Sequence, residues 1–159
     1  MSNAKDIGTK LQGMHLFTEF TPDETQAFLE LVEPLKVKAG ETIVKQDEHG
    51  DCMYILVDGK AGVIHRKEGK QFELATLQAG DFFGELALVD EGPRSADVEA
   101  IVDCTLLRIP QSVVRALAGV YPMAAFKFLV AVGRVLVTRM RKGNQKYIDS
   151  LLLASAGKD

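Results

Sequence analysis

Short apolar runs separated by turn residues fill the middle of the chain, from about residue 35 to residue 110. The runs lie at residues 42–44, 53–57, 61–64, 72–77 and 105–109. Glycine marks the segments between them, which are Ala39-Gly40, His49-Gly50-Asp51, Asp58-Gly59 and Ala79-Gly80-Asp81. Many short strands at close spacing are typical of a β-sandwich or roll, so a doubly wound parallel sheet is not expected.

Helical periodicity precedes this β-rich region. Apolar residues at positions 7, 11, 14 and 16 follow a loosely helical spacing. The segment Thr21-Pro22-Asp23-Glu24 then predicts a helix start, with threonine as the cap, proline at the first helical position and glutamate three residues after the cap. Phe28 and Leu29 supply the apolar side of this helix, and Pro34 ends it.

After Pro110 the helical period returns, with a short helix at residues 111–120 and a longer one from Pro122 to about Ala154. One face of the long helix carries apolar or small residues at alternating spacings of three and four. These residues are Phe126, Leu129, Gly133, Leu136, Met140, Gly143 and Tyr147. Such a seam suits a partner helix, and we expect it to form a homodimer.

A second apolar face of the long helix is formed by valines at positions 130, 132, 135 and 137, and we expect it to pack on the β-rich domain. The alternative is that the seam itself packs only on its own domain. Arg139, Arg141, Lys142 and Lys146 add a basic cluster. We interpret this cluster as a solvated helix face rather than a nucleic-acid site.

The composition is that of an ordinary globular domain with one appended element: 159 residues, 47% hydrophobic and 26% charged. A net charge of −3 argues against direct DNA binding driven by electrostatics. The chain has neither a run of 18 apolar residues nor the apolar core of a signal peptide. We therefore expect a cytoplasmic protein that does not bind membranes.

Residue types that support catalysis or hold metals are sparse. His15, His49 and His65 lack the spacing of a metal site with two histidines and a carboxylate, and no G-x-S-x-G motif occurs. Cys52 and Cys104 lie far apart, outside any CxxC motif. We predict no enzymatic activity, no metal and no cofactor, with two inert buried thiols; a disulfide between them is the alternative.

The strongest candidate for a binding site is residues 80–98, GDFFGELALVDEGPRSADV. Gly84 permits a sharp turn, and residues 85–89 can form about one helical turn whose free N–H groups suit an anion. Arg94 offers a planar fork of donors for a phosphate, and Glu85 suits a hydroxyl that donates a hydrogen bond. Phosphate and hydroxyl together indicate a nucleotide. The alternative is a surface turn in which Glu85 and Arg94 pair with each other.

This segment resembles the phosphate-binding cassette of cyclic nucleotide-binding domains, which occur in catabolite activator-type regulators and in regulatory subunits of cyclic nucleotide-dependent kinases. The family pattern is F-G-E-hydrophobic-A-hydrophobic, then P-R-small-A a few residues later. The chain reads Phe83-Gly84-Glu85-Leu86-Ala87-Leu88 and Pro93-Arg94-Ser95-Ala96. Asp47 departs from the family, which often has glycine there; aspartate tolerates left-handed turns, so we expect a small local adjustment.

The resemblance implies a mainly β fold with flanking helices: an eight-stranded jelly-roll (double-stranded β-helix) barrel with N-terminal helices and a long C-terminal helix. Residues 1–34 would then form an N-terminal helical cap. Residues 35–110 would form the binding barrel, with the cassette at residues 80–98. Residues 111–159 would form the C-terminal helices, which act as lid and dimer interface.

The resemblance also implies roles for individual residues. Arg94 would pair with the cyclic phosphate and Glu85 would accept a hydrogen bond from the ribose 2′-hydroxyl. Ser95 and the backbone near Leu86, Ala87 and Ala96 would surround the phosphate, next to the motif residues Phe83 and Gly84. Val63 and Leu74 would pack on the base. Asn144 of the long helix would meet the outer face of the base.

These roles predict a cyclic nucleotide sensor that signals by movement of its C-terminal helix. Ser95 after the cassette arginine resembles the bacterial branch of the family, which favours cAMP over cGMP as the ligand. Too few residues follow Ala154 for a helix-turn-helix domain, so we expect a stand-alone sensor with an unknown downstream partner. Two alternatives stay open: a degenerate, ligand-free dimerisation module, and a regulatory subunit acting in trans on a kinase, transporter or channel.

Overall fold

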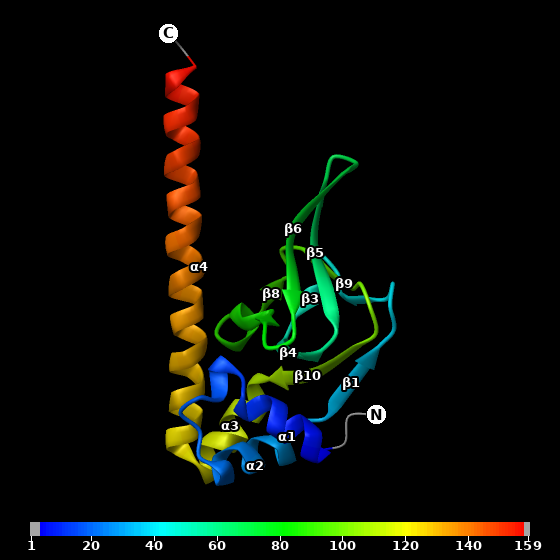
Figure 1. The fold of residues 1–159 in the computed structure, drawn as a ribbon, viewed down its shortest axis with the longest axis vertical. Coiled ribbons are helices and arrows are strands. Elements are labelled where there is room, and N and C mark those ends of the chain that lie inside the picture. The colour runs from blue at the N-terminus through cyan, green and yellow to red at the C-terminus, as the bar shows by residue number, and fades with distance from the viewer. Residues whose placement is uncertain (1–3, 158–159) are drawn as a thin grey trace.

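A helical base, a β-domain and one long projecting helix make up the molecule (Figure 1). The computed structural model describes residues 4–157. Its helices are α1 (Ala4–Gln12), η1 (His15–Phe17), α2 (Pro22–Leu31), η2 (Glu85–Leu88), α3 (Gln111–Val120) and α4 (Pro122–Ala156). Its strands are β1 (Pro34–Val37), β2 (Thr42–Val44), β3 (His49–Gly50), β4 (Cys52–Asp58), β5 (Lys60–Lys67), β6 (Lys70–Gln78), β7 (Phe82–Phe83), β8 (Gly92–Pro93), β9 (Asp97–Ala100) and β10 (Cys104–Pro110).

The strands pair antiparallel in two larger sheets and one short ladder. Within residues 4–157 the four-stranded sheets have the orders β1-β10-β4-β7 and β2-β9-β5-β6, while β3 pairs with β8. The predicted jelly-roll domain with flanking helices is confirmed, although its sheets are not closed into a barrel. Helix accounts for about 46% of the structure and strand for about 31%, because α4 alone has 35 residues.

Alternation along the central strands gives the β-domain two apolar faces. On β4, Ile55 packs with the helical base, while the next residue, Leu56, packs between the two sheets. On β10, Leu107 and Leu106 divide in the same way. A period of two therefore lets one strand pair serve both cores, and it fixes the register, because a slip of one residue would exchange the faces.

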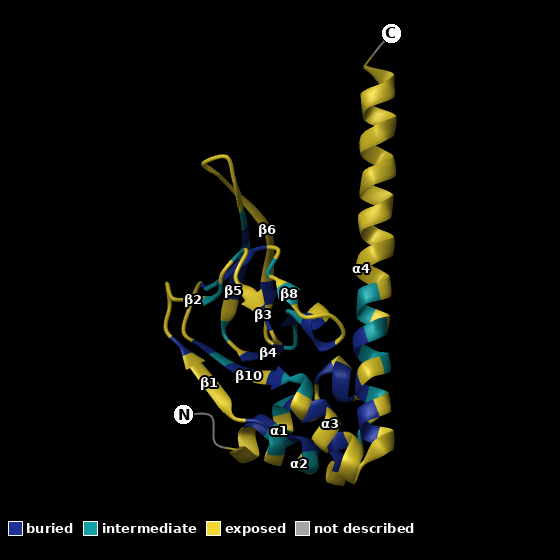
Figure 2. Cartoon of the chain, turned by 180° about the vertical axis from the view of Figure 1, so that it is seen from behind, coloured by how far each residue is buried: buried dark blue, intermediate teal, exposed yellow. Residues whose placement is uncertain are grey.

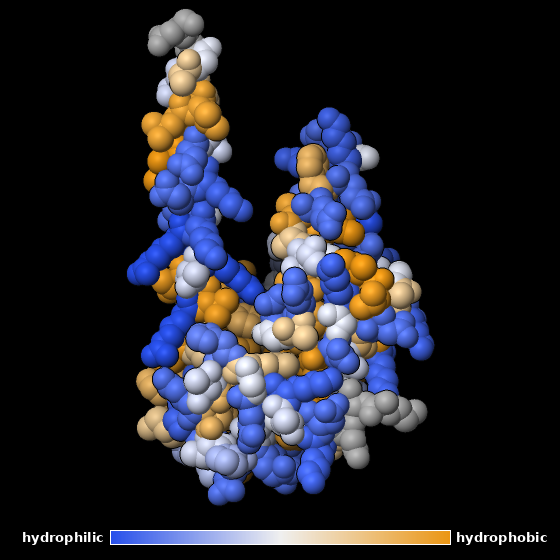
Figure 3. Space-filling model, viewed as in Figure 1, coloured by the Kyte–Doolittle hydropathy of each residue, from blue (hydrophilic) through white to orange (hydrophobic). Residues whose placement is uncertain are grey.

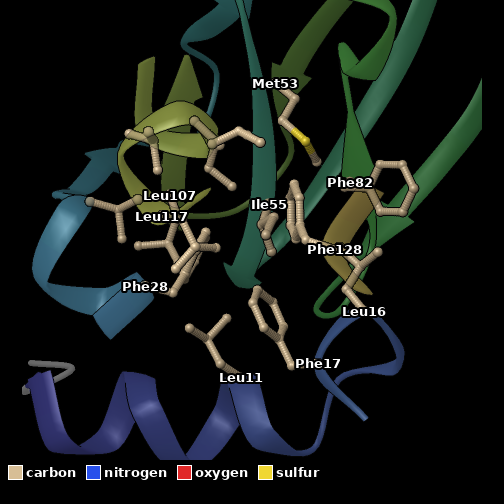
Figure 4. Close-up of a cluster of buried hydrophobic side chains, with 14 of the residues drawn as sticks. Leu11, Leu16, Phe17, Phe28, Met53, Ile55, Phe82, Leu107, Leu117 and Phe128 are labelled. Carbon is tan, nitrogen blue, oxygen red and sulfur yellow. The ribbon is translucent and has the colours of Figure 1, made fainter. Parts of the chain in front are cut away.

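Aromatic side chains join the helical base to α4. The ring centroid of Phe28 on α2 lies 5.0 Å from that of Phe17 and 5.8 Å from that of Phe128 on α4. Figure 4 shows Phe17 and Phe28 below Ile55 and Leu107 of the sheet, and Phe128 beside Ile55. All are almost fully buried, and burying a large apolar side chain stabilises the fold by roughly 1.5–3 kcal/mol. This aromatic cluster fixes the position of the first part of α4 relative to the β-domain.

The predicted start of α2 is confirmed as a capping box. The Thr21 hydroxyl accepts a hydrogen bond from the Glu24 N–H at 3.2 Å, and the Glu24 carboxylate accepts one from the Thr21 N–H at 3.0 Å. Glu24 is only 5% exposed and also pairs with Lys127 of α4 at 2.8 Å. Burial alone would raise the pKa of Glu24, but the hydrogen bonds from Lys127 and Thr21 hold that pKa below its ordinary value.

The long helix α4 has a buried part and an exposed part. Ala124, Ala125, Phe128 and Val132 are buried against the body, whereas every residue from 137 to 157 is exposed (Figure 2). At 1.5 Å per residue the helix is roughly 50 Å long, so its second half projects beyond the helical base. Figure 3 shows apolar side chains near the tip of α4 and a hollow between α4 and the β5–β6 hairpin.

Several smaller predictions are settled by the structure. Cys52 and Cys104 are both buried and free, so the alternative of a disulfide is wrong. Asp47 adopts a left-handed conformation with φ of 69°, as expected for a residue standing in for glycine. Within residues 4–157, no helix is long and apolar enough to cross a membrane.

Candidate functional site

A left-handed glycine begins the short helix of the predicted binding segment. Gly84 follows β7 with φ of 74°, and η2 starts at the next residue. A Cβ at Gly84 would lie 2.5 Å from Nη1 of Arg94 and 3.1 Å from the Cys52 carbonyl oxygen, so any larger residue would clash. The predicted turn is thus present as a 3₁₀ helix, in which the Ala87 N–H donates to the Gly84 carbonyl.

Arg94 is held by backbone carbonyls and not by a carboxylate. Its Nη2 donates to the Cys52 carbonyl at 2.7 Å, and its Nη1 donates to the Gly84 carbonyl at 3.4 Å. No carboxylate among residues 4–157 forms an ion pair with Arg94. The guanidinium is therefore oriented while its charge stays unneutralised, which is the arrangement an anion site requires.

Two further contacts fix the backbone of Arg94. Its N–H donates to the Glu48 carbonyl and its carbonyl accepts from the Asp47 N–H, each at 2.8 Å. The left-handed Asp47 thus positions the loop that pairs with the cassette. Gly50 on β3 leaves the space for the side chain, because a Cβ there would lie 2.3 Å from Nε of Arg94.

Glu85 pairs with Arg139 of α4, so the alternative in which Glu85 and Arg94 simply pair with each other is wrong. Nη1 of Arg139 donates to Oε1 of Glu85 at 2.9 Å, and its Nη2 donates to the Phe82 carbonyl at 3.0 Å. The Arg139 guanidinium also lies over the Phe82 ring, 4.8 Å from its centroid. The basic cluster Arg139, Arg141, Lys142 and Lys146 is exposed, as expected, but Arg139 in addition contacts the cassette.

Two hollows flank the cassette and share Gly84, Glu85, Arg94 and Ser95. The inner one has a volume of about 330 Å³ and the outer one about 410 Å³. The inner hollow is lined by apolar residues and by one arginine of α4: Val44, Val63, Ala75, Leu77, Phe82, Phe83, Ala96, Val98 and Arg139. An apolar chamber with a few charged groups at its mouth suits a small ligand with one flat apolar part and one anionic part.

The structure brings most of the predicted site residues together around these hollows. Phe83 lines the inner hollow and stacks on Tyr54 with ring centroids 5.2 Å apart. Leu86 and Ala87 line the outer hollow on η2. Ser95 is exposed, and its carbonyl accepts a hydrogen bond from Nδ1 of His65 at 2.9 Å.

Leu74 was predicted to line the base pocket, but its side chain is 60% exposed and does not contribute to the hollow. The reason is a bulge in the β5–β6 pairing: Val63 lies opposite Ala75, and the next residue, Ile64, lies opposite Glu73. Leu74 is thus left without a partner and Ala75 takes the inward position beside Val63. A bulge is invisible in a period-two pattern, so the sequence did not reveal it.

Asn144 was predicted to meet the base, but it lies on the exposed part of α4 and lines neither hollow. The α4 residue at the inner hollow is Arg139, which is more than one helical turn earlier. Our sequence reading also missed Val44, Ala75, Leu77 and Val98. Among residues 4–157, no group of acidic, histidine and cysteine side chains is arranged to hold a metal ion.

The fold and the site define a β-domain with a candidate anion-binding turn, which Arg139 of α4 contacts through the Glu85 carboxylate and the Phe82 carbonyl. Residues 34–121, more than half of the chain, match the family described as "Cyclic nucleotide-binding domain". The chain therefore belongs to the cyclic nucleotide-binding domain family.

Relatives with known names support the same assignment. The chain is 31% identical over 109 residues to a cAMP-dependent protein kinase regulatory subunit of Emericella nidulans, covering 69% of this chain and 26% of the relative. It is 26% identical to a CRP-like cAMP-activated global transcriptional regulator of Mycobacterium tuberculosis, covering 90% of this chain and 62% of the relative. The crystal structure of Thermus thermophilus catabolite activator protein superposes with a TM-score of 0.73 at 28% identity, covering 84% of this chain and 61% of that one. The chain spans about a quarter of the kinase subunit's length.

Proposed function

We propose that this protein is a cyclic nucleotide sensor whose ligand is cAMP. The observation that carries the proposal is the Arg94 guanidinium, which is oriented by carbonyls, has no carboxylate partner among residues 4–157, and stands beside Glu85 at the mouth of an apolar hollow. Arg94 binds the cyclic phosphate, assisted by Ser95 and the backbone of Leu86 and Ala96. Glu85 accepts from the ribose 2′-hydroxyl.

The adenine base occupies the inner hollow. Val63, Ala75 and Leu77 supply apolar surface there, and the volume of about 330 Å³ is in the range of small-ligand sites. The resemblance of Pro93-Arg94-Ser95-Ala96 to the bacterial branch supports cAMP over cGMP. One hydrogen bond more or less to the base is worth only about 0.5–1.5 kcal/mol, so discrimination of about tenfold is expected. Asn144 reads the base only if ligand binding brings the second half of α4 toward the cassette.

The output is a change in the position of α4. Its first half is buried against the helical base and its second half is exposed, so a ligand that binds one arrangement of α4 better shifts the equilibrium between arrangements. Met140 and Tyr147 of the expected seam are exposed and support a homodimer through this helix, whereas Leu136 packs partly on the body. Val137, expected to pack on the β-domain, is exposed and extends the row together with Leu151. In this scheme residues 1–34 are the cap, 35–110 the binding domain and 111–159 the lid and dimer helix.

Other parts of the proposal rest on composition and thiol chemistry. The net charge of −3 supports signalling through a protein partner rather than direct DNA binding by this chain. The free, buried thiols of Cys52 and Cys104 support a reducing, cytoplasmic location. The names of the relatives describe regulatory proteins, which supports a role as a regulator and not as an enzyme.

Calorimetric titration with cAMP, cGMP and 5′-AMP tests the proposal directly. We expect cAMP to bind, cGMP to bind about tenfold more weakly and 5′-AMP, which lacks the cyclic phosphate, to bind weakest. The melting temperature should rise with cAMP, because a cAMP concentration of 100 times the dissociation constant increases the free energy of unfolding by about 2.7 kcal/mol. No heat and no shift at millimolar nucleotide would instead support a ligand-free module, in which Arg139 permanently occupies Glu85.

A further inference from the structure

Arg139 covers the one carboxylate to which the ribose would have to bind. Its guanidinium bonds Oε1 of Glu85 and the Phe82 carbonyl, and it lies over the Phe82 ring. As a result the Glu85 side chain is only 11% exposed, although the hollow beside it is open enough to hold a ligand. The Arg139 side chain is itself 42% exposed, so it borders solvent on the side away from Glu85 and Phe82.

We propose that Arg139 is a latch that holds α4 on the cassette in the nucleotide-free protein, and that the 2′-hydroxyl of a bound ribose displaces it from Glu85. The inference rests on the proposed function, because it specifies how that ligand is coupled to α4. It assigns to Arg139 a role opposite to that of a ligand-binding residue: the side chain competes with the nucleotide.

Competition follows from the chemistry of the shared acceptor. A guanidinium–carboxylate pair is charge-assisted and stronger than a bond from a neutral hydroxyl, so exchanging one for the other is unfavourable by itself. The phosphate on Arg94 and the base in the apolar hollow supply the missing affinity. Arg139 therefore lowers the observed affinity for any ligand that needs Glu85, and leaves unaffected a ligand that does not.

Release of Arg139 also frees the projecting half of α4. Every residue from 137 to 157 is exposed. In the part of the chain that the structure describes, Arg139 is the only side chain of that stretch that is hydrogen-bonded or ion-paired to the β-domain or the cassette. Without this contact, only the packing of its first half holds α4 on the body. Ligand binding and helix motion are therefore coupled, because both break the same Arg139–Glu85 pair.

Two ligands, one with and one without the 2′-hydroxyl, distinguish a latch at Arg139 from a role of Arg139 in binding the nucleotide. The wild type, Arg139→Ala and Arg141→Ala are titrated calorimetrically with cAMP and with 2′-deoxy-cAMP, which has no hydroxyl for Glu85. Arg141 is the matched control, because it is an exposed α4 arginine that forms no ion pair within residues 4–157. We expect Arg139→Ala to tighten cAMP binding about fivefold or more, at the lower end of typical coupling, and to leave 2′-deoxy-cAMP binding unchanged.

Weaker or unchanged cAMP binding by Arg139→Ala overturns the latch, and so does an equal gain for both ligands. Arg141→Ala should match the wild type throughout. If the wild type binds no cyclic nucleotide, the proposed function fails, and the state of the latch is then decided by a measurement that needs no ligand.

That measurement follows the position of α4 by spin labels at Gln71→Cys on β6 and Ser150→Cys on α4, since both sites are exposed and the native thiols are buried. Without nucleotide, Arg139→Ala should broaden the distance distribution, while Arg141→Ala should not. In the otherwise native protein, cAMP should produce the same broadening and 2′-deoxy-cAMP should not. An unchanged distribution in nucleotide-free Arg139→Ala would refute the latch whatever the titrations show.

Discussion

The side chain of Arg94 occupies the space that a side chain at Gly50 would need. A Cβ at Gly50 would come within 2.3 Å of Nε and 2.5 Å of Cζ of Arg94, far inside van der Waals contact. Gly84 also borders this space, because a Cβ there would lie 2.5 Å from Nη1 of Arg94. The anion-binding arginine is therefore positioned by glycines from two segments that are distant in the sequence.

Gly50→Ala should weaken cAMP binding without unfolding the protein. The three atoms nearest to the added methyl group would all belong to the flexible side chain of Arg94, so the fold can adapt by moving that side chain out of its slot. A displaced guanidinium loses its charge-assisted bond to the phosphate, which predicts an affinity about tenfold lower or worse. Calorimetry combined with a thermal melt of the free protein measures both effects.

The control for this substitution is Gly119→Ala on α3, where a Cβ would meet nothing within 4 Å. It should leave the affinity unchanged and, because alanine favours helix, should leave the melt equal or slightly higher. Equal affinities for Gly50→Ala and the wild type would show that the slot does not determine the position of Arg94.

Arg94→Gln should remove most of the affinity, because the cyclic phosphate loses the charged partner proposed for it. The expected loss is about 1.5–3 kcal/mol, roughly 10- to 150-fold. Arg94→Lys should recover only part of it, since an ammonium group lacks the planar fork of donors. The control is Arg134→Ala, which removes the exposed ion pair between Arg134 of α4 and Glu19. This variant should bind cAMP as tightly as the wild type.

The cassette was predictable from sequence because its chemistry is local. Gly84, Glu85 and Arg94 lie within one short segment, and the turn that presents them depends on residues inside that segment. The main helices were predictable for the same reason, as were strands β2, β4, β5, β6 and β10, since each has its own periodicity and end signals. The short strands β1, β3, β7, β8 and β9 were not predicted. The capping box at Thr21 and Glu24 illustrates this, as both hydrogen bonds span three residues.

The partners of the cassette were not predictable, because they depend on how distant segments are placed. The inward position of Ala75 depends on a bulge in strand pairing, which no period-two pattern records. Arg139 meets Glu85 only because buried residues such as Phe128 fix the direction of α4. The slot residue Gly50 looked like an ordinary turn glycine, since its function depends on an arginine far along the chain.

The free energy of unfolding should decrease at acidic pH, because Glu24 becomes protonated. Its pKa is held below the ordinary value of 4.5, so this carboxylate contributes stability at pH values above 4.5 and loses it as pH falls through the lowered folded pKa. Glu24→Gln should flatten that part of the pH profile and, by leaving Lys127 without its partner, cost about 1–3 kcal/mol at neutral pH. Urea unfolding from pH 7 to pH 3 measures both, with the exposed Glu30→Gln as the control.

The projecting half of α4 should hold two copies of the chain together. Val137, Met140, Asn144, Tyr147 and Leu151 recur at spacings of three and four on an exposed face, with Met140 64% and Tyr147 66% exposed. A two-fold axis along this face would place each Met140 opposite its copy, so Met140→Glu would bring two carboxylates together in an apolar seam. We expect that variant to be a monomer by sedimentation at micromolar concentration, where the unaltered protein is a dimer. Gln145→Glu adds the same charge off the seam and should stay dimeric; a monomeric wild type, or a variant that dimerises as well as the wild type, would rule out this interface.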